Sequence, residues 1–92
     1  MILIDPPTWP GHGGLWSHLV SDASYAELHT FAAALGIPTR GFDGDHYDVP
    51  STLYEAAIAA GAEPVRSREI VVRLAAAGLR APKRPRRPRD LP

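Results

Sequence analysis

Residues 1–7 read Met-Ile-Leu-Ile-Asp-Pro-Pro, and the run Ile2-Leu3-Ile4 is the most strand-like segment of the chain. A strand that is covered on both faces is typically a continuous apolar run, whereas a strand with one face in water alternates apolar and polar residues. We therefore expect a strand at 2–4 that is buried on both faces and ends at Asp5. A strand of this kind indicates an α/β fold.

Downstream of this strand, three segments have the spacing of amphipathic helices. Each segment has apolar residues about three or four positions apart, begins at a Ser or Thr that can cap a helix, and stops at a glycine that suits a left-handed C-terminal residue. Two of them begin with a capping box, in which Glu follows the Ser or Thr three positions later. The expected helices lie within 24–36, 52–61 and 67–78, and the capping boxes are Ser24 with Glu27 and Thr52 with Glu55.

Short strand-like runs separate these helices, at 38–42 and at 63–66. Strands that alternate with helices predict a parallel sheet with right-handed crossovers, and Pro64 suits an edge strand because proline cannot donate to a sheet ladder. The expected fold is a small three-layer α/β domain over residues 1–80, in the order β-α-β-α-β-α, with a short, mainly parallel, three-stranded sheet. The unpaired edges of such a sheet favour a homodimer or docking to a partner protein.

The composition limits the chemistry that the chain can carry. It has 92 residues, no cysteine, and ten basic and ten acidic residues, which fits one small domain. Without cysteine there is no disulfide, thiolate metal site or cysteine nucleophile, so a metal ion has to be bound by His, Asp or Glu. The sequence also has no leader-like segment and no apolar run that could span a membrane, so we expect a soluble cytoplasmic protein with no membrane partner.

The balanced charge is the sum of an acidic domain and a basic tail. Residues 1–80 carry five Arg against nine Asp and Glu, a net charge of −4, and residues 81–92 carry five Lys and Arg against one Asp, a net charge of +4. Because proline recurs every third residue in the tail, we expect it to be extended and flexible. It could balance the acidic domain as a solvated terminus, or associate weakly with nucleic acid through its cations.

Two connections, 6–23 and 43–50, are the candidates for a functional site. The first is long for a compact domain and contains both tryptophans, which argue against disorder. Each connection follows a predicted strand, and the ligands of open α/β sheets bind beyond the carboxyl ends of the strands. We therefore expect side chains of both connections to meet at one edge of the sheet.

Titratable side chains in and beside these connections could form a metal or acid–base site. In residues 45–48, Asp-His-Tyr-Asp, an extended backbone would point His46 and Asp48 to the same side. Asp45 and Tyr47 would point to the other side. Imidazole and carboxylate ligands together suit Mn, Fe, Ni or Zn, and the same groups without a metal could serve as general acid and base. The expected catalytic residues are Asp5, His46 and Asp48, and the expected metal ligands are Asp5, His12, His18, His46 and Asp48.

Each of these residues also has a structural interpretation. Asp5 before two prolines is a turn signature, and Asp48 could cap the next helix. His12 lies in Gly-His-Gly-Gly, which lacks the sequence of a phosphate-binding loop, and His18 could equally be a buried, hydrogen-bonded core residue. The aromatic residues could cover a small core or stack on a base or sugar. The residues that we expect to contact a ligand are Trp9, His12, Trp16, His18 and Tyr47.

From this set we expect a metal-assisted or acid–base hydrolase or transferase that acts on a phosphate- or nucleotide-containing substrate. A divalent metal ion would be its cofactor. The alternative is a non-catalytic module that binds a small molecule or a partner protein through the Trp/His connection and an exposed sheet edge. Convergence of Asp5 and His46 on one site would favour the first interpretation.

Three motifs, MILIDPP (1–7), WSHLVSD (16–22) and DHYDVP (45–50), resemble in their order and spacing a bacterial family known as domain of unknown function 4031. The resemblance extends over about residues 1–80 and leaves the basic tail outside. It implies no particular activity, cofactor or catalytic residue. The functional expectations therefore rest on the residues themselves.

Overall fold

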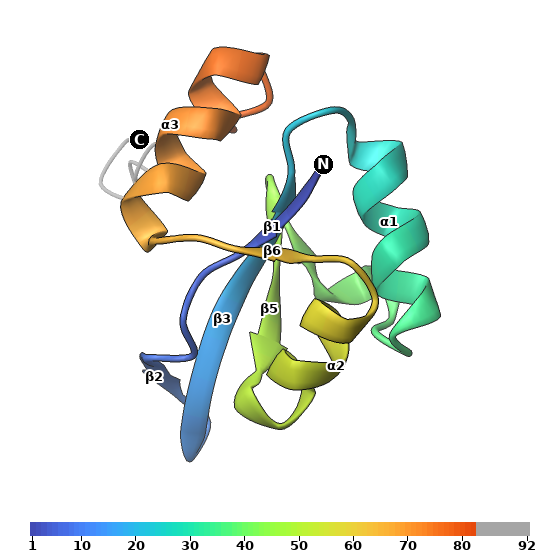
Figure 1. Cartoon of the computed structure of the whole chain (residues 1–92), viewed down its shortest axis with the longest axis vertical. Helices are drawn as coiled ribbons and strands as arrows, with labels where there is room; N and C mark the ends of the chain where they lie inside the picture. Colours follow the sequence, from blue (N-terminus) through green and yellow to red (C-terminus); the bar gives the residue numbers. More distant parts are fainter. Residues whose placement is uncertain (83–92) are drawn as a thin grey trace, which may run out of the picture.

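β1 (Ile2–Ile4) lies inside a mixed sheet in the computed structural model, which describes residues 1–82 (Figure 1). All of its residues are buried, as its apolar sequence predicts. The predicted basic tail lies outside the described residues from Lys83 onward. The elements that follow β1 are β2 (Trp9–Gly11), β3 (Gly14–Ser21), α1 (Tyr25–Ala34), η1 (Thr39–Gly41), β4 (Phe42–Asp43), β5 (His46–Pro50), η2 (Ser51–Leu53), α2 (Tyr54–Ala59), β6 (Glu63–Pro64) and α3 (Ser67–Ala77).

The sheet has six strands and is mostly antiparallel, so the expectation of a mainly parallel, three-stranded sheet is wrong. Its strand order is β4-β5-β3-β1-β6, with β2 paired to β3. Within residues 1–82, β1 and β6 are the one parallel pair. The difference arises because both connections, 6–23 and 43–50, contain strands that return antiparallel beside their neighbours. The alternation of helices and strands in the sequence does not reveal these hairpins.

β2 and β3 form a hairpin around the dipeptide His12-Gly13. Gly11 pairs with Gly14 across the turn, and φ is 45° at His12 and 77° at Gly13. Positive φ at both central residues is typical of a type I′ turn, whose twist matches the twist of the strands it joins. The glycines that indicate a loop by composition therefore form a tight turn between two strands.

Two further expectations about local structure are wrong. The expected strand at 38–42 forms the 3₁₀ turn η1, and strand pairing begins at Phe42. Pro38 precedes this turn, and its carbonyl accepts a hydrogen bond from the N–H of Gly41 at 2.9 Å. The capping box at Thr52 does not form, because Thr52 lies inside the turn η2 that precedes α2.

The cap at Ser24, the helix end at Gly78 and the edge strand are confirmed. The expected cap at Ser67 is wrong, because Ser67 is the first residue of α3 and its hydroxyl donates to Asp5 instead. Ser24 caps α1, where its Oγ accepts a hydrogen bond from the N–H of Glu27 at 3.0 Å. α3 ends at Gly78, which has the left-handed φ of 74°. β6 lies at the edge of the sheet, as Pro64 predicts. None of the helices in residues 1–82 is long and apolar enough to cross a membrane.

Helices pack on both faces of the sheet (Figure 1). α1 and α2 pack on the face that includes Leu19, and α3 packs on the opposite face, which includes Leu3 and Val20. Because side chains of a strand alternate between the two faces, Asp5 and His18 continue the face that α3 covers. The apolar end of this face lies beneath α3, and the polar end forms the candidate site.

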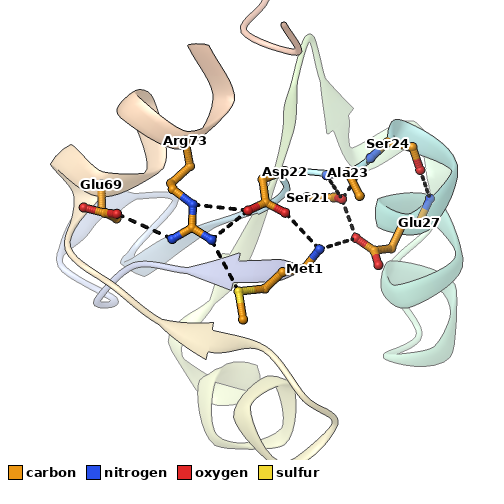
Figure 2. Close-up of polar contacts among 8 residues, drawn as sticks. All are labelled: Met1, Ser21, Asp22, Ala23, Ser24, Glu27, Glu69 and Arg73. Carbon is orange, nitrogen blue, oxygen red and sulfur yellow. Dashed lines mark hydrogen bonds and ion pairs between the residues drawn. The ribbon is translucent and has the colours of Figure 1, made fainter. Parts of the chain in front are cut away.

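An ion-pair network joins β1, β3, α1 and α3 (Figure 2). Asp22, which follows β3, accepts hydrogen bonds from the Met1 ammonium group at 2.9 Å and from Arg73 Nη2 at 2.7 Å. The Met1 ammonium group also donates to Glu27 at 3.0 Å. Hydrogen bonds from the Met1 ammonium group and from Arg73 lower the pKa of Asp22. The network holds α3, the helix that borders the site, against the sheet.

Candidate metal site

Asp5 is a fully buried carboxylate that follows β1 and accepts four hydrogen bonds. Oδ1 accepts from the backbone N–H of His18 at 2.5 Å. Oδ2 accepts from His18 Nδ1 at 2.8 Å, Ser67 Oγ at 2.7 Å and Trp9 Nε1 at 3.1 Å. A carboxylate is costly to bury unless such partners replace its water. The four donors fix Asp5 in place and connect β1 with the hairpin and with the start of α3.

Asp5 determines which nitrogen of the His18 ring carries a proton. Burial raises the pKa of Asp5, but hydrogen bonds from the His18 ring, the His18 backbone and Ser67 outweigh burial, so the pKa lies below its ordinary value. The hydrogen bond to Asp5 raises the pKa of His18, and burial of the ring opposes this effect. Because an ionised carboxylate can only accept, Nδ1 carries the proton and Nε2 of the neutral ring has a free lone pair.

Asp45 and His46 repeat this arrangement. Asp45 is 5% exposed in the turn before β5, and its Oδ1 accepts a hydrogen bond from His46 Nδ1 at 2.8 Å. Its Oδ2 accepts from the N–H of Ala81 at 2.9 Å, and Nη1 of Arg80 lies 3.6 Å from the same oxygen. Nε2 is therefore also the free nitrogen of the neutral His46 ring.

The two histidine rings converge with Asp48. His18 and Asp48 are cross-strand partners in the β3–β5 ladder, and His46 precedes Asp48 by two residues on the same face. The ring centroids of His18 and His46 are 5.1 Å apart, and His46 Nε2 lies 3.3 Å from Asp48 Oδ1. One potential ligand atom from each of the three residues lies within 4.8 Å of the other two. The fold therefore brings together three residues that the sequence nominates as metal ligands.

Two cavities border the His18/His46/Asp48 group. The first has a volume of about 340 Å³ and is lined in part by His46, Arg68 and Arg80. It also contacts apolar residues of α3, so it lies between this helix and the sheet. His18 lines both this cavity and the second one.

The second cavity has a volume of about 450 Å³ and lies beside the β2–β3 hairpin. Asp48 lines it from β5, and His12 and Trp16 line it from the hairpin. Trp9 lines both cavities, as His18 does. The group is therefore accessible from two sides.

A family model with the description "Protein of unknown function (DUF4031)" matches residues 2–77. The chain belongs to the DUF4031 family. The matched span contains the whole His18/His46/Asp48 group together with Asp5 and Asp45, and it ends before Arg80. No curated protein and no solved structure matches the chain.

Other residues with predicted ligand contacts have different surroundings in this DUF4031 domain. Trp16 Nε1 donates to the Gly11 carbonyl at 2.7 Å and stabilises the hairpin. The His12 ring packs edge-on against Trp16, with centroids 6.0 Å apart, and His12 is not among the clustered ligand atoms. Tyr47 is buried on the opposite face of β5, where its hydroxyl lies 2.7 Å from Nδ1 of His29. Tyr47 is therefore a core residue that lines neither cavity.

Sequence patterns do not identify Asp45, Ser67, Arg68 and Arg80 as residues of the site. The expectation that Asp45 points to the side opposite His46 is wrong: Asp45 lies in the turn before β5, where strand alternation does not apply, and its carboxylate contacts the His46 ring. Ser67 has the sequence context of a helix start, yet its hydroxyl bonds to a carboxylate 62 positions away. The two arginines reach the same cavity from opposite ends of α3, which a linear pattern cannot show.

Proposed function

We propose that this DUF4031 domain binds a divalent transition-metal ion through Nε2 of His18, Nε2 of His46 and the carboxylate of Asp48. The main support is that two buried carboxylates, those of Asp5 and Asp45, each lie 2.8 Å from Nδ1 of one of these rings. Metal-binding histidines usually donate their other ring N–H to a carboxylate or carbonyl, which fixes the ring and makes the ligand nitrogen more basic. A histidine that only fills space needs no such partner.

The contact between His46 and Asp48 also supports a cation at this position. With Nδ1 protonated, neutral His46 presents the lone pair of Nε2 to Asp48 Oδ1, 3.3 Å away, which carries lone pairs of its own. Two acceptors at this distance repel each other unless a positive charge lies on one of them or between them. A metal ion bound by both atoms removes the repulsion, and a second proton on His46 is the alternative.

Two imidazoles and one carboxylate leave coordination positions open for water and substrate. This set of ligands fits Zn²⁺, Fe²⁺, Mn²⁺ or Ni²⁺ better than Ca²⁺, which prefers oxygen ligands. A metal ion in such a site polarises a bound oxygen and lowers the pKa of a bound water molecule towards neutrality. The proposed site is therefore suited to hydrolysis.

We propose that the reaction is hydrolysis or group transfer at phosphorus, because Arg68 and Arg80 line the same cavity as His46. Guanidinium groups bind phosphate oxygens through paired hydrogen bonds. The metal ion held by His18, His46 and Asp48 would activate a water molecule for this reaction. In the hydrolytic step, the water oxygen would form a bond to phosphorus, and the proton that the water loses would pass to the leaving oxygen. The bond from phosphorus to the leaving oxygen would break.

Asp5 is a positioning residue in this proposal rather than a metal ligand. Both of its oxygens already accept hydrogen bonds, and the side chain is fully buried. Asp45 has the same role for His46. His12 lines the second cavity, and we assign it to contact with the substrate rather than with the metal.

Calorimetric titration of the metal-free protein with Zn²⁺ and Mn²⁺ tests the proposal. We expect binding of one ion per chain by the wild type and loss of that binding in His46→Ala and Asp48→Ala. His29→Gln is the matched control, because His29 contacts the core residue Tyr47 and lines neither cavity. Equal metal affinity of His46→Ala and the wild type would contradict the proposal. Hydrolysis of bis(p-nitrophenyl) phosphate by the metal-loaded protein then measures the catalytic part.

A non-catalytic binding module is the second candidate function. Trp9 and Leu15 on the β2–β3 hairpin are 46% and 47% exposed, and tryptophan is enriched among the residues that dominate binding interfaces. In this case the metal-loaded protein would hydrolyse no phosphate ester. A ligand or partner captured by the hairpin would bind equally well to His46→Ala and to the wild type.

A further inference from the structure

The His18/His46/Asp48 group lies where the two cavities meet. His46 lines the first cavity, Asp48 lines the second, and His18 and Trp9 line both. A phosphate bound at this group can therefore extend one substituent into each cavity. A phosphomonoester has one substituent and would fill one cavity, whereas a phosphodiester has two. The arrangement of the cavities favours a diester.

The size of the cavities fits a small molecule. Their volumes are about 340 Å³ and 450 Å³, and pockets for small ligands begin at about 300 Å³. Each cavity is therefore suited to one compact group. Because the side chains of the two cavities differ, we expect the two substituents of the phosphate to differ as well.

Aromatic rings and a carboxylate surround the second cavity. The Trp16 ring is held by the hydrogen bond from Nε1 to the Gly11 carbonyl at 2.7 Å, and the His12 ring packs edge-on against it. Trp9 lines the same cavity and is 46% exposed. Fixed aromatic rings stack on flat rings such as nucleobases, and the carboxylate of Asp48 can accept a hydrogen bond from a sugar hydroxyl. This cavity favours a nucleoside.

The wall that α3 contributes to the first cavity is apolar. Ile70, Val71 and Leu74 line it, and Val71 is 43% exposed. The Ser67 hydroxyl and the Asp45 carboxylate also line this cavity, but both are already hydrogen-bonded within the protein. They are poor partners for a second sugar. The first cavity therefore favours an alkyl or aryl group, whose burial against α3 removes apolar surface from water.

Arg68 and Arg80 give the same cavity a positive charge. Nη1 of Arg80 lies 3.6 Å from Oδ2 of Asp45, the residue whose Oδ1 contacts His46, so this guanidinium lies close to the proposed metal site. A phosphodiester carries one negative charge, shared by the two oxygens that bear no substituent. We expect the arginines to bind these oxygens.

We infer that the substrate is a small nucleoside phosphodiester, with its nucleoside in the second cavity beside His12 and Trp16 and an apolar alkyl or aryl group in the first cavity against Val71. The inference rests on the proposed function for its cleavage step. In that step the oxygen of a water molecule bonds to phosphorus, and the bond from phosphorus to the oxygen of the apolar group breaks. This oxygen takes the proton that the water loses. The products are a nucleoside monophosphate and an alcohol or phenol.

Hydrolysis of three chromogenic esters by the metal-loaded protein tests the substrate class. The p-nitrophenyl ester of thymidine monophosphate has a nucleoside and an aryl group on its phosphate, bis(p-nitrophenyl) phosphate has two aryl groups, and p-nitrophenyl phosphate has one. We expect kcat/KM for the thymidine ester to exceed that for the bis-aryl ester at least about tenfold, and the monoester to be the poorest substrate. Equal kcat/KM for the thymidine and bis-aryl esters would overturn the inference.

His12→Asn tests the position of the nucleoside. The substitution removes the ring but keeps the turn, because Asn-Gly is a preferred sequence for a type I′ turn. We expect the preference for the thymidine ester over the bis-aryl ester to fall about two- to tenfold. Circular dichroism confirms that the variant is folded. An unchanged preference would overturn the placement of the nucleoside in the second cavity.

Val71→Asn tests the position of the apolar group. Val72→Asn is the matched control, because Val72 is 54% exposed on the same helix and lines neither cavity. Valine and asparagine also have similar helix propensities. We expect Val71→Asn alone to weaken binding of the thymidine ester, by about three- to tenfold, in a calorimetric titration of the metal-free protein in EDTA. Equal binding by the two variants would overturn the placement of the apolar group.

The titration in EDTA separates this inference from the proposed function, because it measures binding without metal or cleavage. A protein that binds metal and hydrolyses the bis-aryl ester, but does not prefer the thymidine ester, retains the proposed function and overturns the inference. A protein that binds the thymidine ester against Val71 but binds no metal ion overturns the proposed function and the cleavage step. It would retain the nucleoside diester as a ligand of the two cavities. Neither binding nor hydrolysis of the thymidine ester would overturn the inference.

Discussion

Asp45 Oδ1 accepts a hydrogen bond from Nδ1 of His46, the next residue in the chain, at 2.8 Å. The same distance separates Asp5 Oδ2 from Nδ1 of His18, although these two residues are 13 positions apart, with Asp5 directly after β1 and His18 in the neighbouring strand β3. Each pair leaves Nε2 of its histidine free, and one potential ligand atom of each ring lies within 4.8 Å of one of Asp48. The metal proposal depends on this convergence of two separately built pairs.

Replacement of Asp45 by asparagine tests the positioning role. Asp45→Asn keeps the shape of the side chain but removes its charge, and an amide that donates to Nδ1 would move the ring proton to Nε2 and block the ligand atom. We expect the affinity for metal to fall about 10- to 100-fold in a calorimetric titration. Asp43→Asn, at an exposed position of β4 two residues before Asp45, should leave the affinity unchanged. A variant Asp45→Asn with wild-type affinity would exclude the role.

Two serine-to-alanine substitutions are expected to have different effects on stability. Ser67 donates to the buried carboxylate of Asp5 at 2.7 Å, so Ser67→Ala should lower the free energy of unfolding by about 2 kcal/mol. The Ser17 hydroxyl is buried and has no hydrogen-bond partner among the described residues, so Ser17→Ala should leave stability unchanged or raise it. Urea denaturation in EDTA measures both. An equal loss of unfolding free energy in the two variants would show that the hydrogen bond from Ser67 to Asp5 does not stabilise the folded state.

Part of this fold follows from local sequence signals. The run Ile2-Leu3-Ile4 is apolar throughout because both of its faces are buried, and that pattern is visible in the sequence. Ser24 and Gly78 act within one turn of a helix, so their capping roles depend on neighbouring residues alone. The edge position of Pro64 follows from its missing N–H.

The middle of the sheet could not be predicted in the same way. β3 carries the sequence GLWSHLVS, in which Trp16 and His18 occupy the positions that face the cavities, so the strand lacks a regular apolar face. The glycines at 11, 13 and 14 are typical of a loop by composition, and they form a two-residue turn only because two strands pair on either side of it. Pairing between distant segments therefore decides the antiparallel sheet.

The site could be predicted to the extent that it depends on strand alternation. His46 and Asp48 lie on one face because they are two residues apart in β5, while Tyr47 between them enters the opposite core. The partner of His46 could not be predicted, because Asp45 precedes the strand. The role of Asp5 as the hydrogen-bond partner of His18 depends on the register of β1 against β3, which no local pattern specifies.

Two glycine-to-alanine substitutions separate backbone strain from steric contact. A Cβ added at Gly78 or at Gly14 would meet no atom within 4 Å, but only Gly78 of the two has a left-handed backbone, with φ of 74°. We expect Gly78→Ala to lower the free energy of unfolding by about 1–2 kcal/mol, and Gly14→Ala to change it little. Thermal denaturation of both variants measures the difference. Equal stability of the two would contradict the C-terminal capping role of Gly78.

Because of the contacts of Asp22, we expect the free energy of unfolding to depend on pH in the acid range. Because hydrogen bonds from the Met1 ammonium group and Arg73 lower the pKa of Asp22 below its ordinary value of 3.8, the folded state binds this proton less readily than the unfolded state. The stabilisation is therefore complete above the unfolded pKa and is lost as the pH falls through the folded pKa. At about pH 7, Asp22→Asn should lower the free energy of unfolding by about 1 kcal/mol.

Urea denaturation over a range of pH tests this assignment. The stability difference between the wild type and Asp22→Asn should shrink as the pH falls below about 4, where the aspartate becomes protonated in the unfolded state. A difference that stays constant between neutral and strongly acid pH would show that the ionised form of Asp22 makes no contribution. The same curves give the stability of the wild type in the absence of metal.

A crystal structure of the zinc-loaded protein, with anomalous data collected at the zinc absorption edge, tests the central claim most directly. We predict one anomalous peak about 2.0–2.2 Å from Nε2 of His18, Nε2 of His46 and a carboxylate oxygen of Asp48, with Asp5 and Asp45 still on the Nδ1 atoms. A structure at saturating zinc with no peak at this position, and with His46 Nε2 hydrogen-bonded directly to Asp48, would contradict the claim.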